Sequence, residues 1–179
     1  MLLSAKFSLL RGHQLLFFAL LLFTVACSEG NEENKKPSTL SIIAEVNYPL
    51  PQPVLLRDNL PNERGNHRLD SLKWQLLSMQ GLVPYSANSG FFILGKIQDT
   101  PGDFSSLVLY EENPSYNRAW IANYNSTGAI LDYRLVFMQR SDGKVSQSGY
   151  LDENVLEIKK AATNTINYRL LPSGQFSPM

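Results

Sequence analysis

The sequence has little of the side-chain chemistry that metal centres and nucleophilic enzymes use. Its 179 residues include one cysteine and two histidines. A zinc centre needs three or four nitrogen, sulfur or carboxylate ligands, and a nucleophilic enzyme needs a base held beside the nucleophile. We therefore expect no metal site and no cofactor, and we assign no catalytic residue.

An excess of charge of one sign is also missing. The chain has 16 basic and 16 acidic side chains, so its formal net charge is zero. A nucleic-acid-binding protein needs a basic face to neutralise phosphates, so we expect no nucleic-acid partner. Hydrophobic residues make up 44% of the chain, which is enough to build the core of one domain.

The N-terminus has the pattern of an export signal. Lys6 and Arg11 precede an uninterrupted apolar run of 11 residues, Leu15–Val25. Such a run suits a signal peptide and is too short to cross about 30 Å of hydrocarbon as a helix. Removal of residues 1–26 from 179 leaves 153 residues, with 14 basic and 16 acidic side chains and a net charge of −2.

Small residues end this run directly before the single cysteine, in the order Thr24, Val25, Ala26, Cys27. This segment resembles the lipobox of bacterial lipoproteins, although leucine is commonest where Thr24 stands. The resemblance implies that Cys27 is acylated and becomes the new N-terminus, which anchors the protein to a membrane. An ordinary secretory signal that leaves Cys27 as a free thiol is the alternative.

Residues 27–38 read as a polar tether after the lipidated cysteine. Ser28 stands where aspartate favours inner-membrane retention in many Gram-negative bacteria, so the resemblance implies the outer membrane. Glu29, Glu32 and Glu33 resemble the acidic export signal of Bacteroidetes lipoproteins, which implies the cell surface. As a flexible coil, eleven residues span roughly 20 Å, so the domain would float near the membrane and would not pack on it.

The first part of the mature domain, residues 39–179, has three features. Thr39–Val46 is apolar and β-branched, which predicts a strand. Tyr48–Asn66 contains four prolines, which indicates an extended connection that either wraps the fold through Val54, Leu55 and Leu56 or carries function. Leu69–Met79 has helical spacing and also alternates like a strand, and we favour a short helix.

The remainder predicts an antiparallel meander, because short apolar runs alternate with polar turns that contain glycine or proline. The expected fold class is mainly β, as a single meander sheet or a sandwich- or barrel-like domain. The seven predicted strands are Phe91–Ile97, Phe104–Glu111, Arg118–Tyr124, Ala129–Gln139, Lys144–Tyr150, Asn154–Lys160 and Thr165–Leu171.

Alternation within two of these strands predicts one apolar and one wet face. On the first, Leu131, Tyr133, Leu135 and Phe137 would share the apolar face. On the second strand, Ile166, Tyr168 and Leu170 would share the apolar face, and Asn167 and Arg169 would lie on the wet face.

Three aromatic residues on or beside one predicted strand form the candidate recognition surface: Tyr116, Trp120 and Tyr124. An exposed aromatic row stacks on sugars or anchors a protein partner. The alternative is that these rings fill the core.

The remaining polar candidates have simple structural explanations. His67 lies in a polar segment with no nucleophile motif beside it, so we interpret it as a loop histidine. Paired carboxylates do glycosidic chemistry or bind calcium. Of the two pairs here, Asp99 and Asp103 flank a Pro-Gly turn, and Asp152 and Glu153 precede a predicted strand; neither pair has calcium-loop spacing.

These patterns together favour a lipid-anchored, non-enzymatic protein of the outer membrane or cell surface. We expect it to act as a binding or accessory subunit for an envelope protein or a glycan. The alternative is a carboxylate-dependent hydrolase or an enzyme inhibitor of the cell envelope.

Overall fold

The computed structural model describes residues 37–56, 68–79, 81–160 and 164–179. The predicted signal peptide, Cys27, the tether up to residue 36, and His67 lie outside these residues. Pro37–Met179 forms one compact unit. Among the described helices, none has the length and hydropathy to cross a membrane.

The chain folds into a mainly β domain, as predicted. Its helices are α2 (Thr39–Glu45) and α3 (Ser71–Leu76). The strands are β1 (Pro49–Leu50), β2 (Val54–Leu56), β3 (Arg68–Leu69), β4 (Gly90–Ile97), β5 (Ser105–Asn113), β6 (Tyr116–Tyr124), β7 (Ile130–Arg140), β8 (Val145–Asp152), β9 (Val155–Lys160), β10 (Asn164–Leu170) and β11 (Phe176–Pro178).

All of these strands belong to one open sheet with the order β1-β4-β5-β6-β7-β8-β9-β10-β11. Strands β4 to β11 are consecutive neighbours and antiparallel, which is the predicted meander. The sheet is mixed because β1 pairs with β4 in parallel. β3 adds to β4, and β2 adds to β8.

The segment Thr39–Val46 corrects one prediction, because residues 39–45 form α2 and not a strand. Ser38 caps this helix: its side chain accepts from the Ser41 N–H, and the Ser41 hydroxyl group accepts from the Ser38 N–H. This reciprocal capping box satisfies two N–H groups that a helix start leaves unpaired. Ile42 and Ile43 are buried, so tertiary packing outweighs their β propensity.

The segment Leu69–Met79 contains the predicted short helix, α3. Asp70 caps it by accepting from the Lys73 N–H at 2.8 Å. Trp74 is fully buried, and its indole N–H donates to the Val83 carbonyl at 2.8 Å. The helix therefore fixes the following loop against the sheet.

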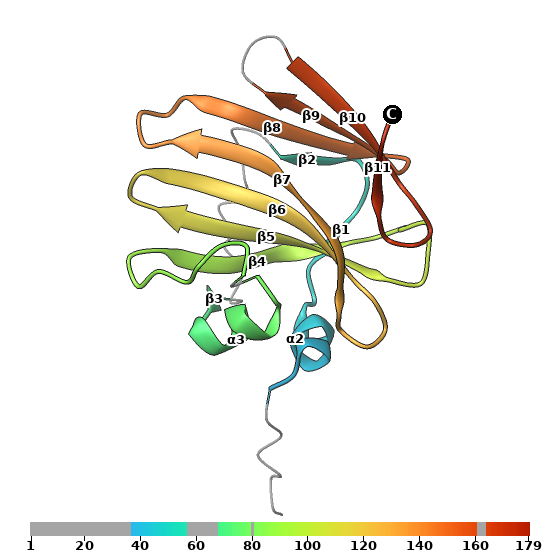
Figure 1. Cartoon of the computed structure of the whole chain (residues 1–179), viewed down its shortest axis with the longest axis horizontal. Coiled ribbons are helices and arrows are strands. Elements are labelled where there is room, and N and C mark those ends of the chain that lie inside the picture. The colour runs from blue at the N-terminus through green and yellow to red at the C-terminus, as the bar shows by residue number, and fades with distance from the viewer. Residues whose placement is uncertain (1–36, 57–67, 80, 161–163) are drawn as a thin grey trace, which may run out of the picture. The chain divides into compact units, whose positions relative to one another are not determined.

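The predicted alternation holds in β10, where Asn167 and Arg169 are exposed and Leu170 is buried, but the central strands are buried on both faces. In β5, Leu107 and Leu109 pack in the helix-side core, and Val108 and Tyr110 pack in a second core. Successive strand residues point to opposite faces, so the two cores lie on opposite sides of the sheet. Figure 1 shows α2 and α3 side by side at the β4 end of the sheet, with β8, β9 and β10 at the other end.

A β-bulge corrects the predicted face of β7. The register between β6 and β7 shifts at Ala119/Trp120, which leaves Val136 as the extra residue. An inserted residue reverses the side of everything beyond it. Tyr133 and Leu135 therefore pack against the helix-side core, and Phe137 lies in the second core.

The proline-rich segment wraps the fold, which was one of its two predicted roles. β1 hydrogen-bonds beside β4, and β2 then crosses to pair with β8. Val54 and Leu56 are buried in the second core, and Leu55 points outward with 45% of its surface exposed. Residues 57–66 of the segment lie outside the described residues.

Candidate functional site

The outer face of β2, β8, β9 and β10 carries a row of four residues from four adjacent strands. Leu55 lies opposite Tyr150, Tyr150 lies opposite Glu157, and Glu157 lies opposite Asn167. With neighbouring strands about 4.8 Å apart, the row spans roughly 14 Å. We call this row and its flanking residues Ser148, Lys159 and Thr165 the Tyr150 face.

The centre of the Tyr150 face is apolar and exposed. Leu55 and Tyr150 keep 45% and 37% of their surface accessible. The two rank among the few exposed large hydrophobic side chains of the described residues. A shallow hollow of about 530 Å³ lies here, lined by Leu55, Ser148, Gly149, Tyr150, Glu157 and Lys159.

Polar groups surround this apolar pair. Lys159 Nζ lies 3.0 Å from Glu157 Oε1, and the register places Ser148 and Thr165 on either side of Lys159. The face thus offers an ammonium, a carboxylate, an amide and hydroxyl groups around a phenol ring. This is the composition of a recognition surface with an aromatic anchor and a polar rim.

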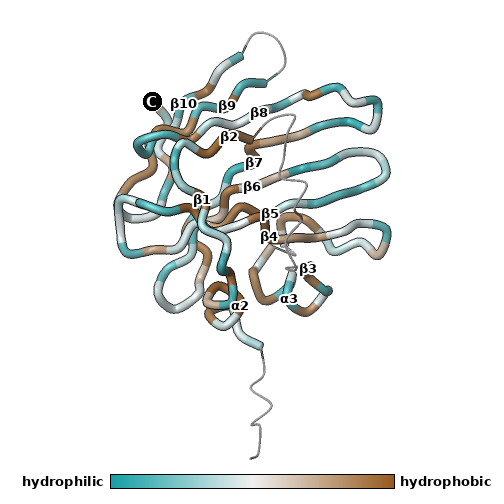
Figure 2. Tube along the Cα trace, turned by 180° about the vertical axis from the view of Figure 1, so that it is seen from behind, coloured by the Kyte–Doolittle hydropathy of each residue, from teal (hydrophilic) through white to brown (hydrophobic). Residues whose placement is uncertain are grey.

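The opposite side of the same strands holds the face rigid. Leu151, Leu156, Ile158 and Leu170 are buried in the second core. Figure 2 shows hydrophobic and hydrophilic residues mixed along β9 and β10. Gly149 permits close packing there, since a Cβ on it would lie 2.9 Å from the Val136 carbonyl oxygen. Tyr150 is therefore presented from a strand packed on both edges and on one face.

The Tyr150 hydroxyl group has a fixed partner on the same strand. It donates to Asp152 Oδ2 at 3.1 Å. This hydrogen bond raises the pKa of Tyr150 above its ordinary value, and the charges of Asp152 and Glu157 act in the same direction. Ionisation of the phenol would place a negative charge beside a carboxylate, so the group stays a neutral donor near neutral pH.

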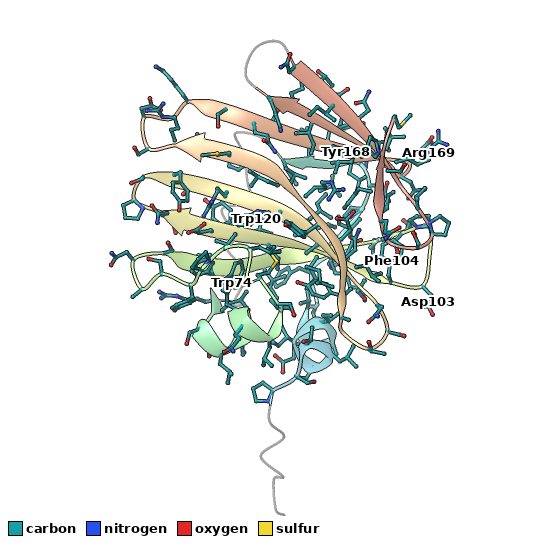
Figure 3. All side chains as sticks on the ribbon, viewed as in Figure 1. Trp74, Asp103, Phe104, Trp120, Tyr168 and Arg169 are labelled. Carbon is teal, nitrogen blue, oxygen red and sulfur yellow. The ribbon has the colours of Figure 1, made fainter. Side chains whose placement is uncertain are left out.

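The structure corrects the predicted aromatic surface on β6. Trp120 and Tyr124 are 4% and 0% exposed and belong to the helix-side core, so neither ring is available to a partner. Trp120 meets Trp74 edge to face with 6.3 Å between ring centroids, and Figure 3 shows both side chains on the α3 side of the sheet. Tyr116 is half-buried, and Arg118 lies over its ring at 4.3 Å.

Asp99 and Asp103 flank a turn, as predicted, whereas Asp152 ends β8 and Glu153 lies in the turn before β9. Glu153 and Asn154, with φ of 43° and 70°, form the two-residue loop between β8 and β9. Asp99 and Asp103 are exposed in the β4–β5 connection. Asp99 lines an open hollow of about 710 Å³ together with Lys96, Gln98, Thr100, Phe104 and residues 46–49 of the preceding segment, except Tyr48.

In the part of the chain that the structure describes, no three histidine, cysteine, aspartate or glutamate side chains gather as metal ligands. The carboxylates with clear partners serve structure. Glu111 pairs with Arg118, and Asp132 pairs with Arg134.

Sequence reasoning missed the Tyr150 face. Tyr150 closes a predicted strand, but its apolar neighbour Leu55 comes from the pairing of β2 with β8, which joins residues almost a hundred positions apart. A usable signal was present in β9 and β10, where Glu157, Lys159, Asn167 and Arg169 alternate with apolar residues.

The chain matches no protein-family model, no curated protein and no solved structure. The functional argument therefore depends on the site itself.

Proposed function

We propose that this protein is a lipid-anchored lipoprotein of the outer membrane or cell surface and that it binds an envelope protein partner without catalysing a reaction. The Tyr150 face carries the proposal, because an exposed aromatic–aliphatic pair with a charged rim suits a protein partner. The lipobox-like segment that ends at Cys27 supports the anchor.

Three of the carboxylates have structural partners that make them poor candidates for the alternative hydrolase. Within the described ranges, Glu111 and Asp132 are committed to arginines, and Asp152 accepts from Tyr150. A hydrolytic pair needs one carboxyl group to give a proton while another acts on the substrate. Groups that hold a fold together by ionic hydrogen bonds are poorly suited to this exchange.

The anchor is tested first by its chemistry. Cells that produce the full chain are labelled with radioactive palmitate, and we expect label in the protein and none in the Cys27→Ala variant. An inhibitor of lipoprotein signal peptidase should cause the longer precursor to accumulate. An unlabelled wild-type protein would remove the lipoprotein part of the proposal.

The Tyr150 face is tested by site-specific photocrosslinking in the same cells. A photoreactive amino acid replaces Tyr150 in one variant and Ser126, an exposed residue of the β6–β7 turn, in the control. We expect a discrete adduct with one protein at position 150 only. The identified partner is then titrated with wild-type protein and with Tyr150→Ala, which should weaken its affinity at least about tenfold if the ring is an anchor. Equal adducts at both positions, or equal affinities, would refute the assignment.

A further inference from the structure

The two helices lie on one side of the sheet, and both point their buried side chains toward it. α2 buries Ile42 and Ile43, and α3 buries Trp74, all in the helix-side core. Because both helices cover the same face of the sheet, their outer surfaces point away from it together. Figure 1 places this helical layer at the end of the domain opposite β8, β9 and β10.

The outer surface of this layer is unusually apolar for an exposed surface. Leu40 on α2, Leu72 on α3 and Leu82 in the next loop are 44%, 50% and 40% exposed. They are three of the seven large hydrophobic residues that are exposed among the described residues. Ala44 lies one turn after Leu40 and is exposed as well, so the outer stripe of α2 is apolar.

The chain itself brings this layer near a membrane. α2 begins at Thr39, and its N-terminal cap, Ser38, lies eleven residues after Cys27 in the sequence. A fully extended chain advances at most about 3.6 Å per residue, so Ser38 cannot be more than roughly 40 Å from a lipidated Cys27. The proposed anchor therefore keeps this end of the domain within reach of the bilayer.

Apolar burial, and not charge, supports contact with a lipid surface. Among the described residues, Lys73 follows Leu72 on α3, but the exposed acids Glu45 on α2 and Asp70 at the cap of α3 offset its charge. Partly inserted leucines contribute the burial of apolar surface.

We propose that the helical layer rests on the phospholipid bilayer through Leu40, Leu72 and Leu82. This inference depends on the proposed lipid anchor, since the anchor keeps the layer near the membrane. It replaces the expectation that the domain floats free. The Tyr150 face then points away from the bilayer, toward partners.

The test uses the full lipidated protein in vesicles of phosphatidylethanolamine and phosphatidylglycerol, with and without brominated acyl chains. Leu72→Trp places a quenchable reporter on the layer, and Tyr150→Trp places a matched reporter on the opposite end. The emission of the parent protein, from the buried Trp74 and Trp120, is subtracted from both.

We expect brominated lipid to reduce the added emission of Leu72→Trp by about one half and to leave that of Tyr150→Trp unchanged, because an interfacial side chain lies roughly 5–10 Å into the headgroup boundary. Flotation of the vesicles reports the anchor separately. Protein that floats with an unquenched reporter at position 72 overturns the inference and leaves the anchor standing. Protein that does not float overturns both.

Discussion

Glu111 and Arg118 face each other across β5 and β6, and Arg118 Nη2 lies 2.5 Å from Glu111 Oε2. The carboxylate is 2% exposed and also accepts from Ser89 Oγ at 3.0 Å. The guanidinium group lies over the rings of Tyr116 and Trp120, at 4.3 and 5.1 Å. This ion pair connects the helix-side core with the loop that precedes β4.

Removal of Arg118 should be among the most destabilising single changes in the domain. Arg118→Ala leaves the Glu111 carboxylate buried with no cation, and breaking such a pair costs about 3 kcal/mol or more. Urea unfolding followed by circular dichroism measures the loss. Arg140→Ala is the matched control, because Arg140 is 66% exposed and its ion pair is weak, with Nε 3.9 Å from Asp142 Oδ2. Its free energy of unfolding should change by less than about 1 kcal/mol, and equal losses would contradict the assigned role.

Alkaline pH should destabilise the protein through Tyr124. Burial raises the pKa of this phenol well above its ordinary value, and its hydroxyl group donates to the Leu77 carbonyl at 3.1 Å. A raised folded-state pKa means that the stability it contributes is complete below pH 10 or so and falls as the pH rises further, because only the unfolded chain then releases the proton.

Unfolding free energies between pH 8 and roughly pH 11.5 test this expectation. Tyr124→Phe should lose about 1 kcal/mol at neutral pH through the missing hydrogen bond. Its stability should also fall less steeply above pH 10 or so than that of the wild type. Parallel curves for the two proteins would show that Tyr124 ionises as readily in the folded state as in the unfolded state.

Gly102 should not tolerate a side chain. A Cβ there would lie 2.1 Å from the Pro172 carbonyl oxygen, which is backbone and cannot rotate away. Gly102→Ala should therefore separate the β4–β5 connection from the β10–β11 turn and cost about 2–3 kcal/mol. Gly81→Ala is the control, since it meets nothing within 4 Å. Its melting temperature should stay near that of the wild type, and a similar drop for both would attribute the loss to backbone freedom instead.

The titration of Tyr150 should depend on Asp152. Their hydrogen bond is the main reason that the Tyr150 pKa is raised, so Asp152→Ala should move that pKa back toward its ordinary value. The ¹³Cζ chemical shift of labelled tyrosine follows this residue during a pH titration. Asp142→Ala, at an exposed turn away from Tyr150, should leave the titration unchanged. An unmoved midpoint in Asp152→Ala would mean that the hydrogen bond does not persist in solution.

Local signals were enough to predict the meander from the sequence. Turns such as Ser141–Gly143 and Asn125–Gly128 mark hairpins by residues that accept positive φ, and Gly128 and Gly143 both have φ of 81°. All seven predicted strands from residue 90 onward are present. The short helix within Leu69–Met79 followed in the same way from local spacing.

What the sequence did not reveal depends on contacts between distant segments. Ile42 and Ile43 favour a strand by propensity, but burial in the core together with the Ser38 cap selects a helix. The bulge at Val136 leaves no composition signal, yet it moves Phe137 to the other side of the sheet. For the same reason, Trp120 could not be separated from an exposed ring such as Tyr150 before the packing was known.

The parallel pairing of β1 with β4 has a mechanical consequence. If a partner bound at the Tyr150 face pulls against a lipid anchor, tension enters the domain through α2 and reaches β2 by way of β1. The Lys96 N–H donates to Tyr48 and the Gln98 N–H donates to Leu50, so two backbone bonds hold β1 along its length. A force along the strand axis loads both hydrogen bonds at once, so that they do not open one after another. The short β1 strand would thus act as a clamp that protects the rest of the sheet from force.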